Sequence, residues 1–214
     1  MILKYLGHSA FTIKTKDARL LMDPYDASIG MKLPKVEADI VTISHHHSDH
    51  DSIDAVSGDP LVVDWPGEYE KSGIRIIGVS TYHDAEKGAK RGENTVFVVE
   101  ADGVRIAHLG DLGHTLTDAK IDEIGDVDVL LVPVGGHYTI NAKQAVEVAR
   151  KVGARIVIPM HFNRPELNTE TFGELTDLQT FLREHGTAEP EELDQLSLKS
   201  GETREGAKIV VLKS

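Results

Sequence analysis

The chain has 214 residues, of which 40% are hydrophobic and 27% charged, and these are the proportions of a soluble globular protein with a full core. Because it contains no cysteine, disulfides and thiolate metal sites are excluded, and a transition metal would need histidine and carboxylate ligands. The net charge of −12 argues against a general nucleic-acid binder, since such proteins neutralise phosphates with basic side chains.

Predicted strands begin at the N-terminus and recur along the chain. Three short strands are expected first, at 2–6, 10–15 and 19–23. Four apolar runs flanked by turn residues are expected to be buried strands, at 39–44, 73–82, 128–134 and 155–160. Two more runs, 94–101 and 104–109, are joined by Asp102-Gly103, which is typical of a tight hairpin.

Helices are expected between the later strands. Asn141 and Gln144 have the spacing of a capping box, and apolar residues follow at helical spacing as far as Gly153. A shorter helix is expected over 117–124.

The C-terminal part is expected to hold another helix and a hairpin. Thr171 and Glu174 have capping-box spacing, for a helix that ends at Gly186. Runs at 195–200 and 207–214 predict a closing hairpin. The alternation of strands and helices predicts an α/β protein, with mixed sheets because of the hairpins.

No linker divides the sequence, so we expect one domain over residues 1–214, and the sequence allows a homo-oligomer. The N-terminus lacks the apolar stretch of a signal peptide, and no apolar run approaches the ~20 residues that span a bilayer. A cytoplasmic protein without a membrane partner is therefore expected.

Polar side chains follow five of the predicted strands. His45, His83, Asp111, His137 and His161 come at or soon after their carboxyl ends. Loops that leave these ends converge on the ligand site of α/β sheets. One such histidine is usually a packed or surface residue, but five strands in agreement indicate a site.

The segment from residue 45 to residue 50 carries the most information. His45 and His47 alternate, so they point to the same side of an extended chain. Asp49 and His50 follow at the expected start of a short helix, which aims a carboxylate and an imidazole at a second metal. His46 points away. A solvated, histidine-rich loop is the alternative, but such tracts are chemically suited to bind metals.

The pattern His45-x-His47-x-Asp49-His50 resembles the signature motif of the metallo-β-lactamase superfamily. The residues that match its motifs, in chain order, are Asp23, His45, His47, Asp49, His50, His83, Gly110, Asp111 and His161. The resemblance implies a four-layer αββα sandwich of two mixed β-sheets flanked by helices, with metals at one edge of the sheets. Gly7-His8-Ser9, Asp23-Pro24, Pro66-Gly67-Glu68-Tyr69 and His108-Leu109-Gly110-Asp111 look most like small bacterial hydrolases grouped with ascorbate-6-phosphate lactonase.

The resemblance also implies a binuclear site. Its ligands are His45, His47 and His83 for the first metal, Asp49, His50 and His161 for the second, and Asp111 as a bridge. Two divalent ions would fit this ligand chemistry, zinc or manganese, with iron also compatible. Two such ions can share a water and lower its pKa, giving a hydroxide at neutral pH, and Asp49 can orient that hydroxide for attack.

The expected activity is hydrolysis of a small, anionic ester, lactone or phosphoester. A metal-dependent nuclease or phosphodiesterase with the same motifs is an alternative, opposed by the acidic charge and by the lack of an RNA-clamping insertion. Redox chemistry at a di-iron centre is another, but the superfamily's flavin-coupled enzymes have Glu at the position of His47. A non-catalytic metal-binding protein is the last alternative.

Several residues are candidates for supporting roles. Asp23 is expected to orient the histidine loop, although Asp-Pro also forms turns. His108 is expected to pack beside the ligands. His137 could protonate a leaving group or bind substrate, or be a loop residue. His8 and His114 have comparable positions with less support.

A basic loop directly follows His83. It contains Lys87, Lys90 and Arg91, which is unusual in so acidic a chain. The loop is either a solvated hairpin or the rim of an anion site, in which Arg91 binds the substrate as a planar fork.

Overall fold

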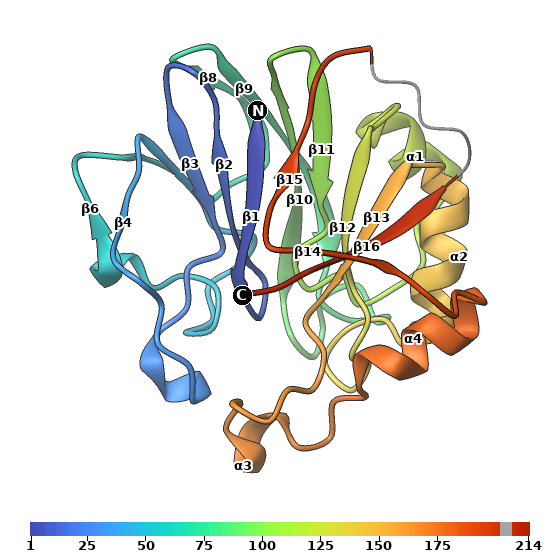
Figure 1. The fold of residues 1–214 in the computed structure, drawn as a ribbon. Coiled ribbons are helices and arrows are strands. Elements are labelled where there is room, and N and C mark those ends of the chain that lie inside the picture. Colours follow the sequence, from blue (N-terminus) through green and yellow to red (C-terminus); the bar gives the residue numbers. More distant parts are fainter. Residues whose placement is uncertain (202–206) are drawn as a thin grey trace.

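Two β-sheets lie face to face, and helices cover the outer face of the larger sheet (Figure 1). The computed structural model describes residues 1–201 and 207–214. The arrangement is the predicted α/β sandwich of mixed sheets. A two-stranded ribbon of β4 (Val36–Glu37) and β6 (Val56–Ser57) packs on the outer face of the smaller sheet.

The smaller sheet has six strands in the order β15-β1-β2-β3-β5-β7. Their bounds are β15 (Leu196–Ser197), β1 (Ile2–Gly7), β2 (Ala10–Lys14), β3 (Arg19–Met22), β5 (Ile40–Thr42) and β7 (Leu61–Val63). Pairing is antiparallel from β15 to β3 and parallel from β3 to β7.

The larger sheet has eight strands in the order β14-β16-β13-β12-β11-β10-β9-β8. Their bounds are β14 (Glu191–Leu193), β16 (Lys208–Leu212), β13 (Ile156–Met160), β12 (Val129–Pro133), β11 (Val104–His108), β10 (Glu93–Ala101), β9 (Ile74–Tyr82) and β8 (Gly67–Lys71). The predicted hairpin between β10 and β11 is confirmed, since Asp102 and Gly103 both have positive φ, as a type I′ turn requires.

Within residues 1–201 and 207–214, four α-helices and two 3-10 helices connect the strands. They are η1 (Ala27–Ile29), η2 (Ile53–Ala55), α1 (Asp118–Ile124), α2 (Ala142–Val152), α3 (Thr169–Phe172) and α4 (Leu178–His185). The α2 prediction is confirmed in detail, because Asn141 and Gln144 form the capping box and Gly153 ends the helix in a left-handed conformation. No helix in the described ranges is long and apolar enough to cross a membrane.

The side chains of β10 show how the layers are held together. Phe97 and Val99 are buried between the two sheets, whereas Val96 and Val98 pack against the helices on the outer face. This alternation follows from the period of a strand, and it buries both faces of the larger sheet.

Two predictions near the C-terminus are wrong. The helix predicted from Thr171 begins only at Leu178, where the Asp177 side chain accepts a hydrogen bond from the Thr180 backbone and replaces the expected box at Thr171 and Glu174. The two C-terminal runs do not form a hairpin, because β15 pairs with β1 and β16 pairs with β13 in the other sheet.

Candidate metal centre

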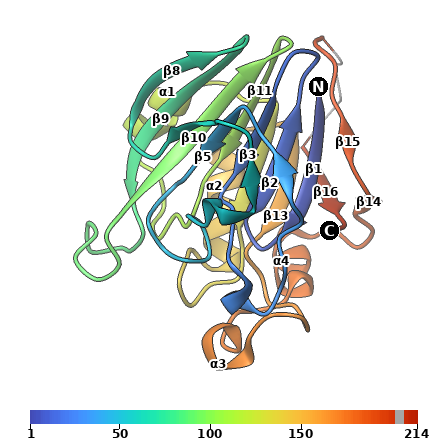
Figure 2. The ribbon, with the colours of Figure 1, turned by 90° about the vertical axis from the view of Figure 1, so that its left-hand side faces the viewer.

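The predicted ligands meet at one end of the sandwich, where the strands of both sheets finish. The loop after β5 carries His45, and His83 and His161 directly follow β9 and β13. Asp111 follows β11 after a two-residue turn. Figure 2 shows α3 and the loop between β9 and β10 at this same end of the sheets.

One group of ligands consists of His45, His47 and His83. Each offers a ring nitrogen, and these nitrogens lie within 4.8 Å of one another. The ring centroids of His45 lie 4.6 Å from those of both His47 and His83. These are the three side chains that the resemblance to the superfamily implies for the first metal.

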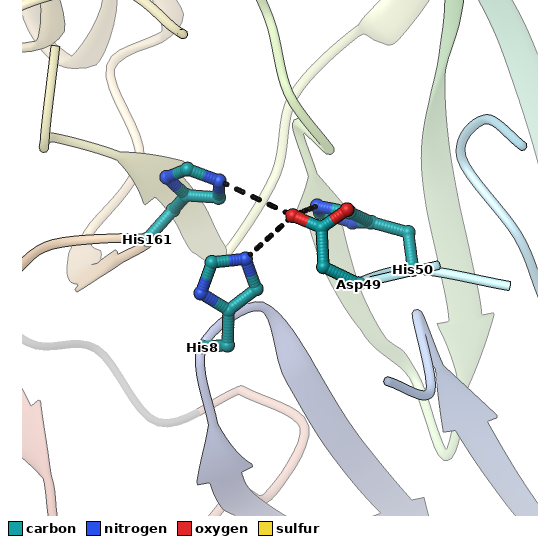
Figure 3. A group of neighbouring side chains, drawn as sticks. All are labelled: His8, Asp49, His50 and His161. Atoms are coloured by element: carbon teal, nitrogen blue, oxygen red, sulfur yellow. Dashed lines mark hydrogen bonds and ion pairs between the residues drawn. The ribbon is translucent and has the colours of Figure 1, made fainter. Parts of the chain in front are cut away.

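A second group surrounds the carboxylate of Asp49 (Figure 3). Asp49 Oδ2 lies 3.4 Å from His50 Nε2 and 4.0 Å from His161 Nε2. These three are the side chains expected at the second metal. The structure adds His8, whose Nε2 lies 3.0 Å from the same oxygen.

The carboxylate of Asp111 reaches both groups. Its Oδ1 lies 3.2 Å from His50 Nε2, and its Oδ2 lies 3.2 Å from His161 Nε2 and 3.3 Å from His83 Nε2. A carboxylate in this position can contact two cations at once, which is the geometry that a bridging ligand needs.

Asp23 orients one histidine of each group. Its Oδ2 accepts a hydrogen bond of 2.8 Å from His50 Nδ1 and one of 2.6 Å from the Ser44 hydroxyl. The hydroxyl oxygen in turn accepts from His45 Nδ1 at 2.9 Å. Both imidazoles therefore carry their proton on Nδ1 and present Nε2 to the centre, as metal-bound histidines usually do.

His108 is fully buried behind the centre. Its Nε2 donates to the Ser9 carbonyl at 2.8 Å, and its Nδ1 accepts from the Gly110 backbone N–H at 3.1 Å. It fixes the turn that carries Asp111 and offers no ring nitrogen to a metal.

Charges in the centre shift the pKa values strongly. Burial would lower the pKa of His50, but the carboxylates of Asp111 and Asp49 raise it well above its usual value. Burial would raise the pKa of Asp111, but His161 and His50 hold it well below its usual value. Burial keeps the pKa of His45 well below its usual value. The proton that His50 holds in this state is one that a bound cation would replace.

The donor atoms fit a divalent cation. Several buried side-chain atoms in the described ranges form no well-aligned hydrogen bond, although three of them take part in the 3.2 Å ion-pair contacts given above: His45 Nε2, His50 Nε2, His161 Nε2 and Asp111 Oδ1. Buried polar atoms are normally satisfied, so a cluster of exceptions points to an ion. Imidazole nitrogen and carboxylate oxygen suit zinc, manganese or iron.

A pocket of about 390 Å³ opens onto the centre. His47, Asp49 and Asp111 line it, and the basic loop contributes Lys90 and Arg91. The pocket also includes apolar and polar side chains from other elements: Ile29, Tyr138, Asn168, Thr171 and Phe172.

Arg91 is placed by two contacts. Its guanidinium lies 5.5 Å from the centroid of the Tyr138 ring, within the range of a cation–π interaction. Its backbone N–H donates to Asp84 Oδ2 at 2.8 Å. Lys87, by contrast, is exposed and does not line the pocket.

Three other histidines lie outside the pocket. His137 is exposed, and its Nδ1 lies 2.9 Å from Glu174 Oε2. His114 accepts a hydrogen bond from the Tyr82 backbone N–H at 3.2 Å. His46 points away from the centre, as expected, and is 63% exposed.

Comparison with known proteins identifies the family. Residues 2–161 match the family model of the β-lactamase superfamily domain. A UPF0173 metal-dependent hydrolase of Thermococcus onnurineus is 30% identical over 188 residues, which are 75% of this chain and 84% of the relative.

Solved structures agree with this match. A Thermotoga maritima protein, described as a Zn-dependent hydrolase of the metallo-β-lactamase superfamily, is 38% identical with a TM-score of 0.81, over 99% of this chain and 97% of that one. Igni18, a metallo hydrolase of Ignicoccus hospitalis, shares the fold at 22% identity and a TM-score of 0.67, over 92% of this chain and 99% of its own. The chain therefore belongs to the metallo-β-lactamase superfamily, among its metal-dependent hydrolases.

Proposed function

We propose that the chain hydrolyses a small, anionic ester, lactone or phosphoester with two divalent ions, zinc or manganese. Two such ions would lower the pKa of a bound water towards ~7 and polarise the scissile bond. The observation that carries the proposal is that two ligand groups, joined by Asp111, face one pocket that also contains Arg91.

The protein's own side chains have distinct tasks in this proposal. The proposed ligands are His45, His47 and His83 for one ion, Asp49, His50 and His161 for the other, and Asp111 for both. Asp49 also reaches the pocket, where its carboxylate can accept a hydrogen bond from the attacking water and orient it. His137 does not line the pocket, so we assign it no part in proton transfer.

Arg91 supports an anionic substrate. A chain of net charge −12 repels anions unless local positive charge offsets its field. Arg91 forms no ion pair with a carboxylate within the described ranges, so its planar fork is available to a carboxylate or phosphate in the pocket. Lys90 contributes a second positive charge, although it also pairs with Glu86.

A substrate panel tests the proposal. The purified protein would be given p-nitrophenyl phosphomonoesters and phosphodiesters, neutral and carboxylated esters, lactones and a short RNA, before and after metal removal by a chelator. We expect hydrolysis of small anionic substrates that stops on metal removal and returns with zinc or manganese. Turnover that survives complete metal removal, or a preference for RNA over every small substrate, would contradict the proposal.

A further inference from the structure

His8 is a third buried histidine around the Asp49 carboxylate, beside His50 and His161. The residue has no solvent exposure. Figure 3 shows its ring facing the Asp49 carboxylate from the turn between β1 and β2, with a distance of 3.0 Å from Nε2 to Oδ2. This is the shortest distance between Asp49 and any histidine of its group.

The backbone of His8 is strained. Its φ of 52° lies in the left-handed region, which a glycine adopts at less cost than a residue with a side chain. Among the non-glycine residues described with positive φ, the buried ones are His8, Asp23 and His161, all at the metal centre. Strain of this kind tends to collect at functional sites, and here it indicates that the imidazole has a role.

The surrounding contacts hold this conformation. The His8 carbonyl accepts hydrogen bonds from the Tyr5 hydroxyl at 2.8 Å and from the His161 backbone N–H at 3.0 Å. The ring packs against those of His161 and Phe172, with centroids 4.2 Å and 5.1 Å away. The imidazole therefore has one direction in which to form a hydrogen bond, towards Asp49.

We propose that His8 is a positioning residue, which donates a hydrogen bond from Nε2 to Asp49 Oδ2 and holds that carboxylate in place to bind a metal. His8 Nδ1 has no hydrogen-bond partner in the described ranges, in keeping with a neutral ring protonated on Nε2. The role rests on the proposed metal centre. The competing role is that of a direct ligand, since the ring nitrogen lies within 4.8 Å of the other donor atoms.

Two substitutions separate these roles. In His8→Gln, the amide nitrogen takes the place of Nε2 and can still donate to Asp49, but an amide is a poor ligand for zinc. His8→Ala removes the donor. Both carry a similar backbone penalty, because both place a non-glycine side chain at positive φ. His137→Ala is a matched control, since His137 has a φ of 49° but is exposed outside the pocket.

The measurement is zinc affinity and stoichiometry, by competition with a chromophoric chelator. We expect His8→Ala to bind one of its two ions ~10- to 100-fold more weakly, the typical effect of losing a partner of a metal ligand. We expect His8→Gln and His137→Ala to stay within about threefold of the parent protein. On an active substrate, kcat should fall in His8→Ala and be restored in His8→Gln.

Any other result contradicts the role of His8 as a positioning residue. Loss of one ion per chain from both His8 variants would make His8 a ligand, and unchanged affinity in His8→Ala would make it a packing residue. If His8→Ala does not fold, His8→Gln alone decides between donor and ligand. A parent protein that binds no zinc would overturn the whole metal centre, whereas bound zinc without hydrolysis would overturn only the proposed function.

Discussion

The buried carboxylate of Asp23 is connected by hydrogen bonds to both groups of ligands. It accepts hydrogen bonds directly from His50 and, through the Ser44 hydroxyl, from His45. Burial would raise its pKa, but His108 and His50 lower it, so Asp23 stays ionised. Its position after β3 was predictable as a family motif, whereas its contact with His45 through Ser44 appears only in the fold.

Replacing Asp23 with Asn should weaken metal binding. The amide keeps one acceptor but loses the charge that orients two imidazoles, so we expect affinity to fall ~10- to 100-fold. Isothermal titration with zinc measures the change. Asp177→Asn is the control, because Asp177 caps α4 and Asn is an equally good cap. Equal zinc affinity in the two variants would show that Asp23 does not orient the ligands.

Arg91 should distinguish charged from neutral substrates. Its replacement by Ala removes a charge-assisted contact worth ~1.5–3 kcal/mol, so KM for an anionic substrate should rise roughly ten- to a hundredfold more than KM for a neutral analogue. Arg91→Lys keeps the charge but loses the fork, and should have an intermediate effect. Lys87→Ala is the control from the same loop. If Arg91→Ala changes both KM values equally, the loop is only a solvated hairpin.

The sequence predicted the proposed metal ligands better than the residues that hydrogen-bond to those ligands. His45, His83 and His161 could be recognised because strand ends carry them to one edge of the sheets. His8 could not be separated from other histidines, because its strained backbone and its contact with Asp49 depend on how β1 and β2 meet the loop after β5. Its sequence signal, Gly-His between two strands, is a weak one.

The loop between β9 and β10 is built on one carboxylate, which sequence analysis missed. Asp84 accepts hydrogen bonds from the backbone N–H groups of Glu86, Gly88, Lys90 and Arg91, at 2.7–2.9 Å. Burial alone would raise the pKa of Asp84, but these donors outweigh it and lower the pKa to about 2. The hydrogen bonds that Asp84 accepts from the loop backbone therefore hold Arg91 in its place beside the pocket.

Replacing Asp84 with Ala should loosen this loop. Four backbone donors would lose their acceptor, so trypsin should cut after Lys87, Lys90 or Arg91 several-fold faster than in the parent protein. KM for an anionic substrate should rise as Arg91 becomes mobile. Glu86→Ala, which removes only an exposed ion pair with Lys90, should change neither measurement much. An unchanged cleavage rate in Asp84→Ala would refute this role.

Elements with local signals were predictable, and those that depend on distant partners were not. The capping box and terminal glycine of α2 lie within one segment and determine it. The start of α4 was predicted wrongly because Thr171 and Asp177 both offer capping side chains. The structure uses Asp177, and Leu175 lies in a separate hydrophobic cluster with Phe172, not on the apolar face of the helix. The pairing of β15 with β1 joins the two ends of the chain, and no short-range pattern encodes it.

Acid should destabilise the metal-free protein as a whole. Burial lowers the pKa of His8 from 6.5 to about 4, and the pKa values of His45 and His108 are also lowered, mainly by burial. Below pH 6.5 the unfolded chain therefore binds protons that the folded protein excludes, so stability is lost as pH falls towards about 4. The raised pKa of His50 acts in the opposite direction, but His50 is one residue against three whose pKa values are lowered.

Urea unfolding of the metal-free protein at pH 7.5 and pH 5 measures this effect. We expect a lower free energy of unfolding at pH 5, and a smaller decrease in His8→Gln, which lacks one of the buried imidazoles. With metal bound, acid should also release the ions, because protons compete for the same nitrogens. Equal or greater stability at pH 5 would mean that these histidines are not held neutral by burial.

The proposed function depends on two divalent ions, one held by each of the two groups of ligands. Inductively coupled plasma mass spectrometry would count zinc and manganese in the parent protein, in His47→Ala and in the matched control His46→Ala. Both side chains are exposed, so neither change should unfold the protein, but only His47 belongs to a ligand group. We expect about two ions per chain in the parent protein and in His46→Ala, and a clear loss of metal in His47→Ala. Full occupancy of both sites in His47→Ala would contradict it.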